Sequence, residues 1–185
     1  MIDEILKDAD IRMGKSIDAL HSAFAKIRTG RANPDLLDGI MVPYYGTDTP
    51  LNQVATVTVE DARNLVISPW EKSLIPDIEK AILRSDIGIT PASTGDIVRI
   101  PLPALTEENR KNLTKVARSE AEHGRVAIRN IRRDALSHIK DFEKDHEISE
   151  DEARRASDRI QKLTDSKIAD MDHALAEKES DLLQI

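Results

Sequence analysis

The stretch from Thr106 to His146 constrains the fold of this chain more than any other. It contains no proline and a single glycine, Gly124. Its apolar residues recur every three or four positions, which places them on one stripe of an α-helix. The stripe consists of Leu113, Ala117, Ala121, Gly124, Ile128, Ile131, Ala135, Ile139 and Phe142. Such a helix would be on the order of 60 Å long at ~1.5 Å per residue. Because isolated helices are only marginally stable in water, the stripe requires partner helices along its length.

Two further helices are predicted at the ends of the chain. The first covers residues 2–29, stops at Gly30 and cannot continue through Pro34. The other begins at Ser149, which forms a capping box with Glu152, and runs almost to the C-terminus. The three helices are similar in length, so we predict a three-helix bundle with the terminal helices packed on the central one.

The segment between the first two helices has a different character. All eight prolines of the chain lie between Pro34 and Pro103. The segment suggests short strands in GIMVPYYG, QVATVTVE, NLVISPW and DIVRIPL, a turn at residues 46–50, a helix at 73–84 and a loop at 88–95. We therefore predict an α+β protein in which a small α/β domain, residues 31–104, is inserted into a bundle formed by residues 1–30 and 105–185.

Two short linkers join the predicted domains. They consist of Thr29, Gly30 and Arg31 on one side and Pro103, Ala104, Leu105 and Thr106 on the other. Relative motion is the ordinary expectation for domains connected in this way, so these residues are predicted to form a hinge.

A band of basic residues follows the central helix. Lys111, Arg118, Arg125 and Arg132 are spaced seven residues apart, and Arg129 joins the same band. Since seven residues make nearly two helical turns, these side chains stay on one side of the helix, beside the apolar stripe. Their stems can pack while their guanidinium groups point outward. The alternative is a solvated helix flank with ordinary ion pairs, such as Arg125 and Arg129 with Glu122.

Charge is distributed unevenly along the chain. The net charge is −7, yet residues 105–140 carry nine basic and five acidic residues, while residues 141–185 carry seven basic and fourteen acidic residues. A chain of this kind can bind one defined polyanionic surface in one orientation and be repelled elsewhere. Aromatic residues make up only 3% of the chain, which disfavours base-stacking platforms.

Composition also restricts the other possibilities. The absence of cysteine excludes disulfides and thiolate chemistry and fits a reducing cytoplasm. We expect neither a membrane span nor a signal peptide. We expect no enzyme, cofactor or metal, because the sequence contains no phosphate loop, HExxH or GxSxG motif, and Asp170 with His173 lacks a third ligand. Trp70, at a strand-to-helix corner, is expected in the core or at a domain contact.

Several motifs together resemble the ribosome recycling factor family. They are KIRTGRA, YYGTDTPL, RIPLPALTEENRK and RVAIRNIRRDA, and the resemblance covers the whole chain. It implies a long three-helix bundle and a small α/β domain arranged like an L. It also implies a monomer that binds the large ribosomal subunit after termination. With elongation factor G and GTP it would split ribosomes into subunits, which initiation factor three then keeps apart.

The resemblance also assigns RNA contacts. The arginines of the family's motifs correspond to Arg28, Arg31, Arg129, Arg132 and Arg133. Arg110 matches the second basic residue of the family's TEERRK. Helix geometry adds Lys111, Arg118 and Arg125 to these predicted contacts. Asn109 and Gly124 depart from the family pattern. Two other classes stay open: a helical scaffold or adaptor for an acidic protein partner, and an enzyme with its site between the domains.

Overall fold

The structure, a computed structural model, describes residues 1–29, 31–85 and 87–183. It divides into two compact units. The first contains Met1–Phe24 and Thr114–Ser180, and the second contains Ala25–Leu113 together with the residues from Asp181 onward. The domain boundaries at residues 30 and 105 and the L-shaped arrangement stay predictions.

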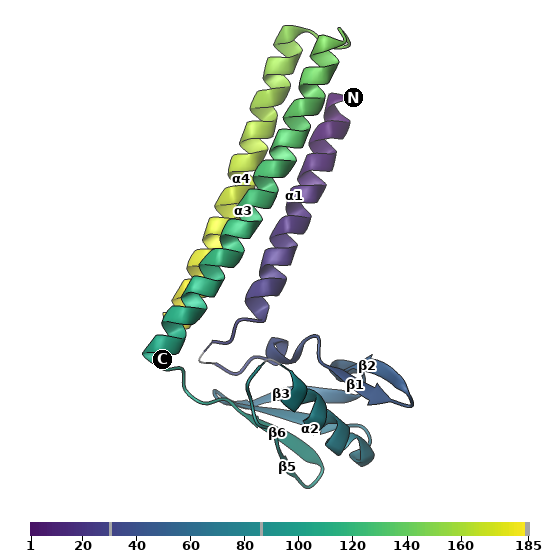
Figure 1. Cartoon of the computed structure of the whole chain (residues 1–185), viewed down its shortest axis with the longest axis vertical. Coiled ribbons are helices and arrows are strands. Elements are labelled where there is room, and N and C mark those ends of the chain that lie inside the picture. Colours follow the sequence, from purple (N-terminus) through teal and green to yellow (C-terminus); the bar gives the residue numbers. More distant parts are fainter. Residues whose placement is uncertain (30, 86, 184–185) are drawn as a thin grey trace. The chain divides into compact units, whose positions relative to one another are not determined.

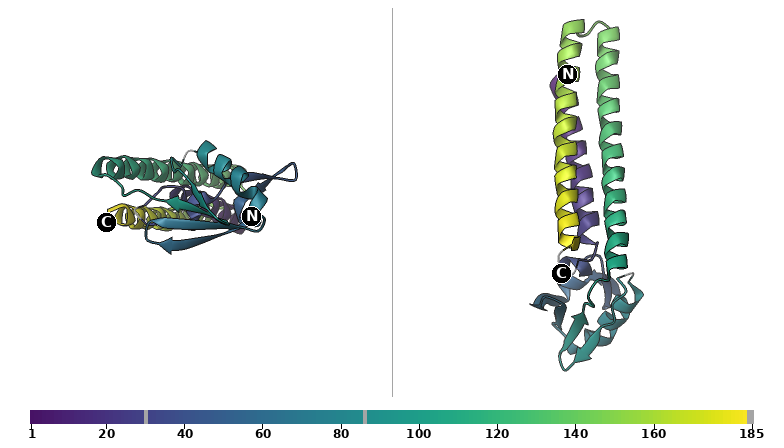
Figure 2. Two further views of the ribbon diagram at one scale, coloured as in Figure 1. Left: turned by 90° about the horizontal axis from the view of Figure 1, so that it is seen from below. Right: turned by 90° about the vertical axis from the view of Figure 1, so that its left-hand side faces the viewer.

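Three long helices make up the bundle. They are α1 (Ile2–Ala25), α3 (Glu107–Lys144) and α4 (Glu150–Leu183), and they run alongside one another (Figures 1 and 2). Polar contacts join α1 to both neighbours: Arg12 Nη2 lies 3.1 Å from Asp134 Oδ2 of α3, and Lys167 Nζ of α4 lies 2.9 Å from Asp10 Oδ1. The predicted apolar stripe of α3 forms its buried face, with Ala117, Ala121, Ile128, Ile131, Ala135 and Ile139 buried. The expected helical bundle is thereby confirmed.

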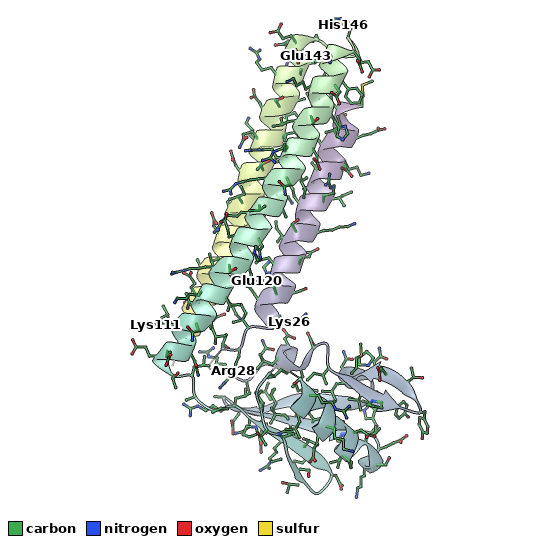
Figure 3. All side chains as sticks on the ribbon, in the orientation of Figure 1. Lys26, Arg28, Lys111, Glu120, Glu143 and His146 are labelled. Atoms are coloured by element: carbon green, nitrogen blue, oxygen red, sulfur yellow. The ribbon has the colours of Figure 1, made fainter. Side chains whose placement is uncertain are left out.

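Local signals fix the ends of α3 and the start of α4. Thr106 Oγ1 accepts a hydrogen bond from the Asn109 N–H at 3.1 Å, which caps the N-terminus of α3. At the other end His146 adopts a left-handed backbone with φ 57°, and the Glu147 N–H donates to the Phe142 carbonyl. Ser149 Oγ then accepts from the Glu152 N–H at 3.1 Å, as the predicted cap requires. Figure 3 labels Lys111 and His146 near the two ends of α3.

The first helix ends earlier than its sequence pattern suggests. We predict a helix through residue 29, but α1 ends at Ala25. Ile27, which continues the apolar pattern, is only 7% exposed, although it lies beyond the helix. The residues from Ala25 onward belong to the second unit, so the helix ends where the chain passes from one unit into the other.

Gly124 of α3 packs directly against α4. A Cβ atom at this position would lie 2.9 Å from both Sδ and Cε of Met171, whose side chain is fully buried. Alanine has a helix propensity about 1 kcal/mol better than glycine, but here it would displace the end of the Met171 side chain. The contact with the Met171 side chain therefore offsets the helix-propensity advantage of alanine at this position.

We expect the Gly124→Ala substitution to change the free energy of unfolding by less than about 0.5 kcal/mol, because the helix-propensity gain is offset by repacking. In a Met171→Ala background the same substitution should stabilise the protein by about 1 kcal/mol, because the obstacle is gone. Chemical denaturation of the four proteins measures both values. An equal stabilisation in both backgrounds would show that Met171 does not oppose the alanine.

The second unit is built from two antiparallel sheets and one helix. Its strands are β1 (Met41–Tyr44), β2 (Thr47–Pro50), β3 (Ala55–Asp61), β4 (Asn64–Pro69), β5 (Ala92–Thr94) and β6 (Ile97–Pro101), and its helix is α2 (Ile75–Arg84). Short 3₁₀ turns occupy Pro34–Leu37, Leu51–Gln53 and Lys72–Leu74. β1 pairs with β2, and the larger sheet has the order β3-β4-β6-β5. Leu65, Ile67, Ile78, Val98 and Ile100 are fully buried in its core.

Three details of this unit differ from the prediction. The segment predicted as a turn at residues 46–50 is mostly β2, because the chain reverses at Tyr45 and Gly46, whose φ angles are 49° and 80°. The predicted loop at 88–95 contains β5, whose residues are all exposed and so carry no alternating pattern. Trp70 is 67% exposed, which makes its assignment to the core wrong.

Candidate nucleic-acid interface

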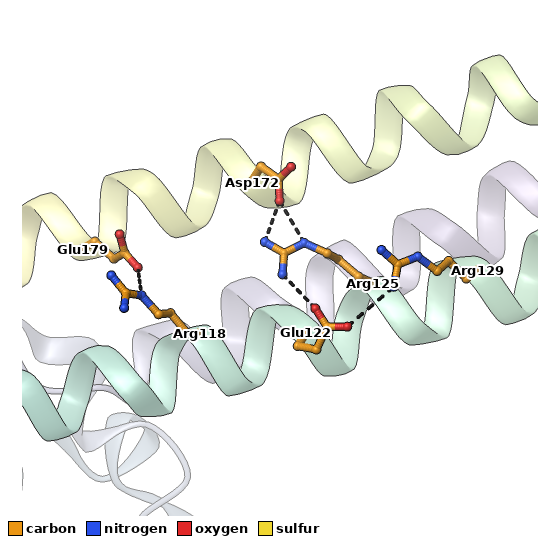
Figure 4. A network of polar contacts seen from close by, with 6 residues as sticks. All are labelled: Arg118, Glu122, Arg125, Arg129, Asp172 and Glu179. Carbon is orange, nitrogen blue, oxygen red and sulfur yellow. Dashed lines mark hydrogen bonds and ion pairs between the residues drawn. The ribbon is translucent and has the colours of Figure 1, made fainter.

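The heptad-spaced arginines of α3 make polar contacts with α4, although Arg118 remains 65% exposed. Arg125 donates to Asp172 Oδ1 from Nε at 2.9 Å and from Nη2 at 2.6 Å, and its side chain is only 19% exposed. Arg118 Nε donates to Glu179 Oε1 at 2.6 Å. Figure 4 shows both arginines reaching across from α3 to carboxylates on α4. The outward orientation that we predict is therefore wrong for Arg125.

The acceptors on α4 repeat with the same spacing as the arginines. Asp172 and Glu179 are seven residues apart and run antiparallel to Arg125 and Arg118. Asp165 and Arg132 continue the two series, and Gln161 links them. Arg132 Nη1 donates to Gln161 Oε1 at 3.3 Å, and Gln161 Nε2 donates to Asp165 Oδ1 at 2.8 Å. We call Arg118, Arg125 and Arg132 with these acceptors the arginine seam.

The contacts of the seam favour the charged form of Arg125. Hydrogen bonds to Asp172, and secondarily to Glu122, raise the pKa of Arg125 above its ordinary value against the opposing effect of desolvation. Arg132 is less well satisfied, because its Nε is buried and finds no hydrogen-bond partner among the described residues. A buried guanidinium N–H without a partner is unusual and costly.

The outer edge of the band on α3 is more accessible. Arg129 is 46% exposed, and its Nη1 lies 3.5 Å from Glu122 Oε1. Arg133 is exposed, and among the described residues no ion pair engages it. Lys111 lies 3.4 Å from Glu107, one helical turn away. Arg110 is half-buried and takes part in an interaction within the chain. Arg129 and Arg133 are therefore exposed arginines of this helix that a ligand can reach.

Arg28 has an unusual environment. Its Nε and Nη2 are buried without a hydrogen-bond partner in the described part of the chain, and desolvation lowers its pKa. It lines a pocket of about 550 Å³ within the second unit, together with Leu105 and Asn109. Figure 3 shows Arg28 on the segment that follows α1. Arg31, three residues further on, is exposed.

The two predicted hinge segments are anchored at one turn. The Ala32 N–H donates to the Ala62 carbonyl, and the Leu102 N–H donates to the Arg63 carbonyl, both at 2.7 Å. The turn itself is held by Asp61, whose Oδ1 accepts from the Arg63 N–H at 2.9 Å. This bond, with those from Asn64, lowers the pKa of Asp61. Ala32 and Leu102, which lie where the two hinge segments meet the small domain, are thus fixed next to each other.

The hinge residues themselves are held to different degrees. Thr29 Oγ1 accepts from the Arg31 N–H at 3.4 Å, while Gly30 lies outside the described residues. Pro103 and Ala104 are exposed, whereas Leu105 is buried. Thr106 caps α3, as described above, so that end of the linker is fixed. The hinge stays a prediction.

His173, considered with Asp170 as a metal ligand, has another partner. His173 Nε2 lies 3.0 Å from Glu177, one helical turn away on α4. In the part of the chain that the structure describes, no group of three or more His, Asp or Glu residues is arranged to hold a metal ion. Over the same residues, no helix is long and apolar enough to cross a membrane.

The sequence interpretation missed the acceptors of the seam. Asp165, Asp172 and Glu179 repeat every seven residues on the last helix, and that spacing matches the arginines in reverse order. A comparison of the two heptads could have found the pairing. Without this comparison, the sequence did not distinguish Arg118 and Arg125, which pair with the last helix, from Arg129, which does not.

A family model described as "Ribosome recycling factor" matches residues 20–183. The chain belongs to the ribosome recycling factor family. Among curated relatives, the ribosome-recycling factors of Hahella chejuensis and of Marinomonas sp. (strain MWYL1) are 60% and 59% identical over 185 residues, covering all of both chains. The family resemblance inferred from the motifs is confirmed.

Solved structures of the family have the same fold. A solution structure of a ribosome recycling factor matches with a TM-score of 0.82 and 36% identity, covering 100% of this chain and 98% of that one. A second match, with a TM-score of 0.70 and 47% identity over all of both chains, comes from models of the T. thermophilus ribosome recycling factor and the E. coli elongation factor G bound to the E. coli post-termination complex. The predicted α+β class, with a helical bundle and a small α/β domain, is confirmed.

Proposed function

We propose that this protein recycles ribosomes: it binds the large subunit of the post-termination complex and, with elongation factor G and GTP, splits the ribosome into subunits. One observation carries the proposal. The chain aligns over its full length with the T. thermophilus factor, which is described together with elongation factor G on a post-termination complex. Initiation factor three would then keep the subunits apart.

The charges of the bundle support binding to ribosomal RNA. Arg129 and Arg133 present guanidinium groups on the exposed side of α3, and Arg132 lies half-buried beside them. Guanidinium groups bind phosphate oxygens in a fork geometry, which positions a protein on RNA without recognising sequence. Arg31 and Arg110 would extend the contact, and the acidic residues of α4 would disfavour binding through the opposite face.

The proposed mechanism is physical rather than covalent. The protein acts as a monomer in the cytoplasm, needs no cofactor and is not an enzyme; elongation factor G supplies the energy through GTP hydrolysis. The bundle is held on the RNA by its arginines, while the hinge lets the small domain move when elongation factor G acts on it. This motion would disturb an RNA contact between the subunits.

A splitting assay tests this function. Post-termination ribosomes are mixed with the protein, elongation factor G, GTP and initiation factor three, and dissociation is followed by light scattering. We expect dissociation only with all components, and a loss of activity in the Arg132→Ala variant. Gln161→Ala is the matched control, because it removes the partner of Arg132 and leaves the cation in place.

The outcomes separate the candidate functions. Dissociation that falls with Arg132→Ala but not with Gln161→Ala supports recycling through RNA contacts. A folded Arg132→Ala protein that splits as well as the parent would contradict its assignment. If the parent neither binds ribosomes nor splits them, the adaptor function is favoured, and its partner binding should then resist RNase.

A further inference from the structure

We propose that Glu122 is an internal competitor of the RNA phosphates: its carboxylate occupies the guanidinium groups of Arg125 and Arg129 and thereby limits how tightly the bundle holds the ribosome. This inference rests on the proposed function. It assigns to an acidic residue within the basic band a role in setting affinity.

The geometry of Glu122 resembles that of a bridging phosphate. Its Oε2 lies 3.1 Å from Arg125 Nη1, and its Oε1 lies 3.5 Å from Arg129 Nη1 (Figure 4). Each oxygen thus faces a different arginine. A phosphate group bridging two arginines would place its oxygens in the same way, since carboxylates and phosphates both accept from guanidinium groups.

The other carboxylates of this network have a different role. Asp172 accepts two hydrogen bonds from Arg125, on the side turned toward α4, and leaves Nη1 to Glu122. Glu179 accepts a hydrogen bond from Nε of Arg118, and its side chain is only 28% exposed. These contacts join α3 to α4. Glu122, in contrast, belongs to α3, is 54% exposed and makes its contacts within that helix.

The contact of Glu122 with Arg129 is suited to exchange. Both side chains are about half exposed, and their atoms are 3.5 Å apart, longer than a normal hydrogen bond. Exposed ion pairs of this kind are weak, so an arriving phosphate can displace the carboxylate. The displaced charge then remains near the phosphate and repels it. The factor would consequently bind less tightly than its arginines alone permit, which favours its departure after recycling.

The test compares Glu122→Gln with the unchanged protein in binding to purified large subunits. We expect binding roughly twofold to fivefold tighter, the fold-change equivalent of one exposed ion pair. The gain should come from slower dissociation and shrink as salt increases. The unfolding temperature should stay the same, because Asp172 still holds Arg125. Glu122→Asp keeps the charge and should show no gain.

Glu120→Gln is the matched control. It makes the same change of charge two residues away, and Glu120 therefore points to a different side of the helix. Equal gains from Glu120→Gln and Glu122→Gln would reduce the effect to net charge and overturn the inference. A folded Glu122→Gln protein that binds no tighter than the parent would overturn this inference and leave the proposed function unaffected. Failure of the parent to bind in a salt-dependent way would overturn both this inference and the proposed function.

Discussion

Alanine at both Arg129 and Arg133 should weaken binding to the large subunit at least ~100-fold, because each removes a charged hydrogen bond to a phosphate worth about 1.5–3 kcal/mol. Both residues are exposed and neither belongs to the arginine seam, so the unfolding temperature should not change. The slope of log affinity against log salt should become shallower by about 1.4–1.8, since two phosphate contacts are lost. A salt titration of binding to purified large subunits measures both quantities.

The control for this experiment lies on α4. Arg154 and Arg155 are both about 70% exposed, and both pair with Asp151. Replacing them by alanine removes the same two charges from the bundle, outside the predicted RNA contact. We expect less than a twofold effect from this double variant. If both double variants weaken binding equally, overall charge rather than the band on α3 controls affinity, and the assignment of Arg129 and Arg133 is wrong.

The seam changes what is expected of the other arginines. Arg118 and Arg125 are engaged by carboxylates of α4, so a phosphate would have to displace Glu179 or Asp172 to reach them. Their role as RNA contacts, which helix geometry suggested, stays a prediction. The family motifs pointed instead to Arg129, Arg132 and Arg133, two of which are the exposed cations of the outer edge. Heptad spacing alone predicts a band, but it does not tell which edge meets a neighbouring helix.

Where a signal is periodic and long, the sequence predicts the fold well. The stripe of α3 and the cap at Ser149 correspond to buried residues and to an observed hydrogen bond. Where a strand is short and exposed, the signal is absent. β2 reads TDTP and β5 reads AST, and neither alternates between apolar and polar residues. Each pairs with an adjacent strand in a hairpin, as Ala92 does with Arg99, and the pairing rests on the backbone rather than on a side-chain pattern that the sequence displays.

The same limit applies to the site. Arg28, Arg129 and Arg133 could be named from motifs, but their accessibility could not. The burial of Arg28 depends on packing that no motif contains. The contacts of Glu122 with Arg125 and Arg129, in contrast, lie within one helix and follow from their spacing in the sequence. Similarly, α1 ends at Ala25, where the chain passes into the second unit, whereas its apolar pattern continues to Ile27.

Two core substitutions should separate the stabilities of the two units. Ile128 of α3 lies in the first unit and Ile67 of β4 in the second, and both are fully buried. Replacing either by alanine leaves a cavity and should cost about 2–5 kcal/mol. Because each unit has its own core, we expect Ile128→Ala to weaken the protection of amides in α3 and α4 only, and Ile67→Ala to weaken that of β3, β4 and β6 only.

Hydrogen exchange resolved by segment makes this measurement, with each variant serving as the control for the other. The expectation follows from the described cores: the buried side chains around Ile67 all come from residues 36–102, so removing its methyl groups disturbs no contact of α3 with α4. Loss of protection across both units in either variant would mean that they unfold as one cooperative body. A hinge that permits motion of the small domain during recycling would then require a different physical basis, because domains that move independently should also open independently.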